Sequence, residues 1–87
     1  MDSATINLSV ALMQTGNLKE AIALLERNLQ RSPDWVDARY NLGLAYAYAG
    51  DFVAARRELA TLSRLNPSLA RALAKLINQT ARASRPK

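Results

Sequence analysis

The sequence repeats itself with a period of 34 residues, and this repeat constrains the fold more than any other feature. The two periods share identical residues at eight places, and seven of them carry the pattern: Asn7, Leu8, Ala11, Gly16, Ala21, Leu25 and Pro33 lie one period before Asn41, Leu42, Ala45, Gly50, Ala55, Leu59 and Pro67. A fixed period near this length, with small and large side chains at set places, is typical of stacked helical hairpins. The repeat therefore predicts an all-α fold in which two antiparallel hairpins stack on each other.

Signals for helix ends fall at the same points of both periods. Gly16 and Gly50 suit the left-handed backbone conformation that ends many helices, because glycine has no Cβ to clash. Pro33 and Pro67 cannot continue a helical hydrogen-bond ladder. Five helices are predicted: 3–15, 18–31, the stretch from Asp34 to Gly50, the stretch from Asp51 to Asn66, and 68–81. Their predicted N-caps are Asp2 or Ser3, Asn17 (in a capping box with Glu20), Asp34, Asp51 and Ser68.

Side-chain size predicts how these helices pack. Small residues mark two places where helices approach closely, Ser9 with Gly43 and Ala21 with Ala55. Large residues are expected to fill the space between the hairpins: Leu8, Leu12, Leu18, Leu25, Leu42, Tyr46, Phe52 and Leu59. The first helix carries two apolar stripes, one with Leu8, Ala11 and Leu12 and the other with Ile6, Val10 and Met13. Two stripes imply contacts on more than one side, or one stripe that awaits a partner.

The chain is predicted to form one domain over 1–82, with repeats at 2–35 and 36–69. The helix at 68–81 is expected to cap the second repeat, and 82–87 to be a frayed basic tail. Residues 1–67 hold seven acidic and seven basic side chains, so the net charge of +5 comes entirely from the residues that follow: Arg71, Lys75, Arg82, Arg85 and Lys87. Such a basic end suits an acidic peptide, nucleic acid or an anionic surface, or is a solvated helix face.

The composition argues against several functional classes. The chain has no cysteine and no histidine, so it lacks thiolate ligands and the commonest general base. Its acids are scattered over helix starts and outer faces, and it has no glycine-rich phosphate loop. We therefore predict no catalytic residues, no metal and no cofactor. No apolar run reaches the ~20 residues that cross a bilayer, and the start lacks a secretory signal pattern, so a cytoplasmic location without membrane insertion is expected.

Over about residues 2–81 the pattern resembles the tetratricopeptide repeat family. The resemblance is carried by the framework of small and large residues and by the prolines that end each repeat. Thr5 and Arg39 replace the tryptophan of the family pattern, and Asn28 and Leu62 replace a small residue late in the second helix of each hairpin. Asn28 would hinder close packing unless its amide finds a backbone partner. The resemblance implies a right-handed superhelical stack.

The resemblance also implies a binding surface. Tetratricopeptide repeat proteins bind peptides or protein segments on a concave face that the first helix of each hairpin lines. Carried over position by position, the candidate peptide- or protein-binding residues are Ile6, Asn7, Val10, Met13, Tyr40, Asn41, Leu44, Tyr48, Arg71, Lys75 and Asn78. Ser3, Gln14, Asp37, Ala47, Ala74 and Arg82 complete that face. The spacing supports the assignment, since side chains three or four residues apart share one helix face.

Two interpretations compete at this surface. The apolar stripe is either a site for a partner or internal packing between neighbouring first helices. Some family members hold the terminal carboxylates of chaperone tails, and Asn41, Arg71 and Lys75 match three of those positions. Ile6 and Val10 stand where lysine and asparagine should be, so the carboxylates of such a tail would be only partly satisfied. Arg71 has a second explanation, which is an ion pair with Asp37, because Asp37 stands at the equivalent place on the adjacent helix.

Three functional hypotheses follow. The first is a non-enzymatic interaction module whose concave groove binds an apolar segment with acidic residues at one end. The second is a homodimeric scaffold that buries Ile6, Val10, Tyr40, Leu44 and Tyr48 against a second copy, because two hairpins are fewer than the three repeats such stacks usually need. The third, nucleic-acid binding through the basic end, lacks aromatic residues among the cations and an evident recognition helix.

Overall fold

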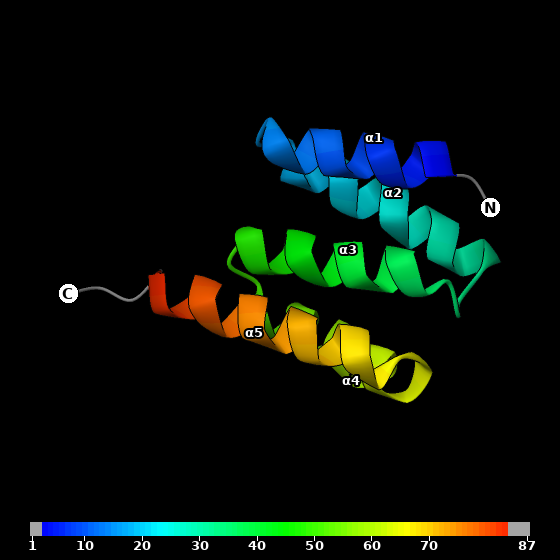
Figure 1. Ribbon diagram of the computed structural model, residues 1–87. Coiled ribbons are helices and arrows are strands. Elements are labelled where there is room, and N and C mark those ends of the chain that lie inside the picture. Colours follow the sequence, from blue (N-terminus) through cyan, green and yellow to red (C-terminus); the bar gives the residue numbers. More distant parts are fainter. Residues whose placement is uncertain (1–2, 84–87) are drawn as a thin grey trace.

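The computed structural model describes residues 3–83, which form five helices and no strand (Figure 1). The helices are α1 (Ser3–Gln14), α2 (Leu18–Arg31), α3 (Val36–Tyr48), α4 (Phe52–Leu65) and α5 (Pro67–Ala83). This confirms the predicted all-α fold and the number and order of its helices. No helix in this part of the chain is long and apolar enough to cross a membrane.

The helices form two layers. α1, α3 and α5 lie side by side and run in the same direction, while α2 and α4 lie behind them (Figure 1). α3 is the centre of the arrangement, because it contacts α1, α2, α4 and α5. The first helices of the two hairpins therefore share one face of the molecule, and α5 extends that face.

Two clusters of buried side chains hold the layers together. Leu25 and Leu29 of α2 pack against Ala38 and Leu42 of α3 and join the two hairpins. The larger cluster joins α3 and α4 to α5: Ala47, Ala55, Leu62, Ala70, Leu73 and Ile77. Burying apolar surface of this kind is the main favourable term in folding.

Small side chains occupy the close approaches, as predicted. Ser9, Ala21 and Ala55 are fully buried, and Gly43 is buried too. A Cβ at Gly43 would lie 2.7 Å from Cδ2 of Leu73, so any larger residue would force the Leu73 side chain to shift. The amide of Asn28 donates to the carbonyl of Leu24 at 2.7 Å, which supplies the backbone partner that packing at this position requires.

The predicted ends of the hairpin turns are correct at both glycines and at one cap. Gly16 and Gly50 each have φ of +83°, in the left-handed region that other residues avoid. Asp51 is the N-cap of α4, and its carboxylate accepts a hydrogen bond from the amide of Ala54 at 3.1 Å.

Two predicted caps are wrong, and a third lacks its side-chain bond. Asn17 is the N-cap residue of α2 as predicted, but its side-chain oxygen makes no cap bond, and its Nδ2 donates to Thr15 Oγ1 at 2.9 Å. Asp34 lies in a turn closed by the amide of Trp35 and the carbonyl of Ser32, and Trp35 is the N-cap of α3. Ser68 lies inside α5, whose first turn is capped by Asn66 through the amide of Leu69 at 3.0 Å. Pro67 begins the helix, where a missing N–H costs nothing.

Two further expectations change at the ends of the stack. Leu8 was expected to fill space between hairpins, yet 52% of its surface is exposed, because no helix of the described chain precedes α1. Arg82 was expected in the frayed tail but lies in α5. The rest of that predicted tail, 84–87, falls outside the described residues, as do Asp2 and the side chain of Ser3 as predicted caps.

Candidate binding groove

An open hollow lies where the end of α1 meets α3. Val10, Met13 and Gln14 of α1 line one side, and Asn41, Leu44 and Tyr48 of α3 line the other. Its volume is about 430 Å³. Residues three or four apart on each helix supply both walls, so the hollow follows directly from setting α1 beside α3. Five of its six lining residues are among the predicted site residues.

Asn41 is the polar group of this hollow. Only 8% of its surface is exposed, and its amide donates to the carbonyl of Asp37 at 2.8 Å, which fixes the orientation of the side chain. No buried side-chain oxygen or nitrogen in the described residues lacks a hydrogen-bond partner. The Asn41 oxygen has no protein partner among them, so it is open to solvent and free to accept a hydrogen bond from a ligand.

Tyr48 forms the outer rim of the hollow. It lies in the last turn of α3, and 52% of its surface is exposed. The aromatic body contributes apolar contact area while the hydroxyl reaches water. The hollow thus combines an apolar wall, an aromatic rim and one oriented carboxamide, a combination common in sites that bind short segments.

A sequence profile of the tetratricopeptide repeat family matches residues 12–80, which is most of the chain. The chain belongs to the tetratricopeptide repeat family. No curated protein and no solved structure matches it. Tetratricopeptide repeat domains are protein–protein interaction modules, so the hollow on the shared face of α1 and α3 is the first place to look for a partner.

Other predicted apolar residues of this tetratricopeptide repeat chain divide between the groove and the core. Ile6 packs against the Leu25–Leu42 cluster, and Tyr40 and Leu44 pack against the cluster that contains Leu73 and Ile77. All three are half-buried. Internal packing therefore accounts for part of the predicted stripe, and the face keeps its open apolar surface mainly around Tyr48 and Met13.

The predicted polar and basic residues lie outside this hollow. Asn7, Lys75 and Asn78 are exposed on α1 and α5. Arg71 lines a separate, smaller hollow of about 250 Å³ between α4 and α5, together with Leu59, Ser63, Pro67, Ala70 and Ala74. The predicted site residues thus do not line one continuous hollow: one hollow lies between α1 and α3, and the other lies between α4 and α5. The predicted alternative for Arg71 is wrong, since no ion pair joins it to Asp37 in the described chain.

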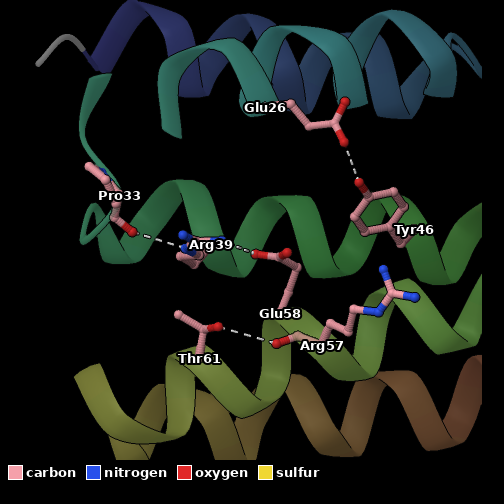
Figure 2. A network of polar contacts seen from close by, with 7 residues as sticks. All are labelled: Glu26, Pro33, Arg39, Tyr46, Arg57, Glu58 and Thr61. Carbon is pink, nitrogen blue, oxygen red and sulfur yellow. Dashed lines mark hydrogen bonds and ion pairs between the residues drawn. The ribbon is translucent and has the colours of Figure 1, made fainter. Parts of the chain in front are cut away.

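One polar network was not predicted (Figure 2). Arg39 donates from Nε to the carbonyl of Pro33 at 3.0 Å and from Nη1 to Glu58 at 2.8 Å, while the Tyr46 hydroxyl donates to Glu26 at 2.5 Å. Burial and the adjacent Glu26 carboxylate together raise the pKa of Tyr46 well above its usual value. The sequence feature that could have indicated this network is Arg39, which replaces the tryptophan of the family pattern. A half-buried arginine needs an anion nearby, and Glu58 supplies it.

Proposed function

We propose that this protein is a non-enzymatic interaction module that binds an extended peptide or protein segment across α1, α3 and α5. An apolar side chain of the segment enters the hollow beside Tyr48, and acidic residues lie over α5. The observation that carries the proposal is the hollow itself, where two helices distant in sequence bring apolar walls and an oriented carboxamide together.

The apolar end of the segment is set by the hollow. Val10, Met13 and Leu44 offer aliphatic and thioether surface that adapts to different side chains, as methionine does at many binding surfaces. Asn41 accepts a hydrogen bond from a backbone amide of the segment and thereby fixes its direction. Tyr48 covers the bound side chain from outside, and aromatic residues in such positions often dominate binding energy.

The positive charge of α5 determines where the acidic residues of the bound segment lie. This helix contains no acidic residue, and Arg71, Lys75 and Arg82 recur at the spacing of one helix face. All three are exposed. Charges at such a rim steer association and select partners more than they add affinity, so we expect the acidic requirement to weaken as salt rises.

Selection from a library of short random peptides tests the proposal without a known partner. Peptides that bind the protein are expected to pair a large apolar residue with aspartate or glutamate a few residues away. Tyr48→Glu places a charge at the rim and is expected to weaken the selected peptides by about tenfold or more. Val53→Glu is the matched control, because Val53 is 65% exposed on α4, which lies in the other layer. Equal loss in both variants, or selection of no apolar residue, contradicts the proposal.

The basic end has its own control. Arg71→Glu with Lys75→Glu is expected to abolish the preference for acidic residues at low salt and to leave the apolar preference in place. Lys19→Glu with Arg27→Glu makes the same change in net charge at exposed positions of α2. If both double variants weaken binding equally, only the overall charge matters and the assignment of the acidic end to α5 is wrong.

The predicted alternative of a homodimer through the concave stripe has less support. Ile6, Tyr40 and Leu44 already bury part of their surface in the two core clusters, so they offer little new area to a second copy. Nucleic-acid binding is supported only by charge, because α5 has no aromatic side chain on which a base could stack.

A further inference from the structure

The outer face of α1, opposite α3, resembles an internal face of the stack. Ala4, Leu8 and Ala11 are identical to Ala38, Leu42 and Ala45 one period later. In α3 these three residues are buried, and Ala38 and Leu42 pack against Leu25 and Leu29 of α2. In α1 the same three side chains are exposed, and Leu8 shows 52% of its surface against 2% for Leu42.

The opposite end of the stack is built differently. Where α3 has Tyr40, Leu44 and Tyr48, α5 has Ala74, Asn78 and Arg82 one period later. Small and polar residues thus replace the large apolar ones in the last helix of the described chain. α5 is adapted to water, as a capping helix requires, while α1 keeps the residues of a covered face.

We propose that the outer face of α1 binds the same face of a second copy of this chain and forms a two-fold dimer. The distribution of charge permits a second copy at this face. The net charge of +5 comes from residues that follow Pro67, and α1 does not contact α5, so two copies that meet through α1 keep their basic ends apart. α1 is the one helix among the five described that has no charged residue, so copies can meet here without bringing like charges into contact.

Side-chain size also favours two-fold pairing. Ala4, Leu8, Ala11 and Thr15 follow one another three or four residues apart and share one face. An antiparallel crossing centred between Leu8 and Ala11 sets Leu8 of each copy against Ala11 of the other, which is large against small. Thr15, at the edge of this face, already donates its hydroxyl to the carbonyls of Ala11 and Leu12, at 3.0 and 3.1 Å. Covering it therefore leaves no donor unsatisfied.

The contact area of this dimer is small. One face of a helix this short buries less than a standard interface of about 1,200–2,000 Å². We therefore expect a weak, concentration-dependent dimer. The dimer leaves the hollow beside Tyr48 open, so it is independent of the proposed peptide binding.

Light scattering and sedimentation equilibrium over a dilution series test the dimer. The weight-average mass of the full chain is expected to rise from one chain at about 5 µM towards two chains at about 1 mM. Leu8→Glu and the milder Leu8→Ser are expected to remain monomeric throughout, with unchanged helical content by circular dichroism. Val53→Glu, an equally drastic change on α4, is expected to dimerise like the unmodified chain. A constant monomer mass up to about 1 mM, or dimerisation that persists in Leu8→Glu, overturns the proposal.

A synthetic peptide of residues 17–32, which contains α2, tests whether the outer face of α1 binds a helix of another protein instead of a second copy. α2 is the helix that covers the equivalent face of α3. Suppose that the unmodified chain stays monomeric and binds this peptide, and that Leu8→Glu abolishes the binding. The outer face of α1 then binds a helix of another protein rather than a second copy, and the proposal is overturned. Selected groove peptides serve as the second readout. Their affinity is expected to be the same for Leu8→Glu and the unmodified chain, so failure of the dimer and failure of the groove are separable.

Discussion

At the scale of single residues, the helix caps show that a residue type that favours capping does not always form a cap bond. Asn17 and Asp51 stand at equivalent places of the two hairpin turns, and both are of types that favour N-cap positions. Only Asp51 bonds a free amide of the following helix, that of Ala54. The side chain of Asn17 donates from Nδ2 to Thr15 Oγ1, and its oxygen bonds no amide of α2. The sequence predicts the position of both caps, but whether the side-chain oxygen reaches a free amide appears only once the turn is folded.

This difference predicts unequal losses of stability. Asp51→Ala is expected to lower the free energy of unfolding by about 1 kcal/mol, because the amide of Ala54 loses its acceptor. Asn17→Ala removes no cap bond and is expected to cost less than half as much. Urea denaturation of both variants measures the two values. Equal losses would mean that the cap bond of Asp51 contributes nothing beyond the propensity of the residue.

At the scale of helices, the position of a helix in the stack decides the role of its side chains. Leu8 and Leu42 are the same residue at the same place of the repeat, and both are predicted to be buried. α2 covers Leu42, whereas no described helix covers Leu8. A repeat in sequence cannot reveal this, because burial depends on the neighbour and not on the residue. The same limit explains Tyr40 and Leu44. The repeat pattern assigns both residues to the groove, but in the structure they pack partly against the core formed with α4 and α5.

The two leucines test this account directly. Leu42→Ala is expected to lower the free energy of unfolding by about 2–4 kcal/mol, since it removes a buried side chain and leaves a cavity. Leu8→Ala is expected to cost under about 1 kcal/mol at micromolar concentration, where the chain is monomeric. Thermal and urea unfolding of both variants supply the comparison. A large loss for Leu8→Ala in dilute solution would mean that α1 packs differently from the arrangement described.

The contact between α2 and α3 is also expected to depend on pH. The pKa of Tyr46 is raised in the folded chain above its ordinary value of 10.0, so the folded state holds the phenol proton more tightly than the unfolded state. The stabilisation is complete below pH 10 and is lost as the pH rises above it, because the unfolded chain then releases the proton first. Tyr46→Phe is expected to flatten the fall of unfolding free energy above about pH 10. An unchanged slope in that variant would show that other groups cause the fall.

At the scale of the whole molecule, the layer of first helices changes its character along the stack. α1 is uncharged, α3 carries one acid and one base, and α5 carries only bases. Helix number, order and this gradient of charge are all predictable from the sequence, because they depend on periodicity and composition. The separation of the α1–α3 hollow from the α4–α5 hollow is not, because it depends on how the folded helices pack against one another.

The central claim is that α1 and α3 together form the wall of one binding hollow. Methyl-group NMR with a peptide selected from the library measures this most directly. Signals of Val10 and Met13 on α1 and of Leu44 on α3 are expected to shift together and to saturate at the same peptide concentration. Val53 on α4 and Ile22 on α2 are expected to stay unchanged. Shifts confined to α2 and α4, or to one of α1 and α3 without the other, would contradict the claim.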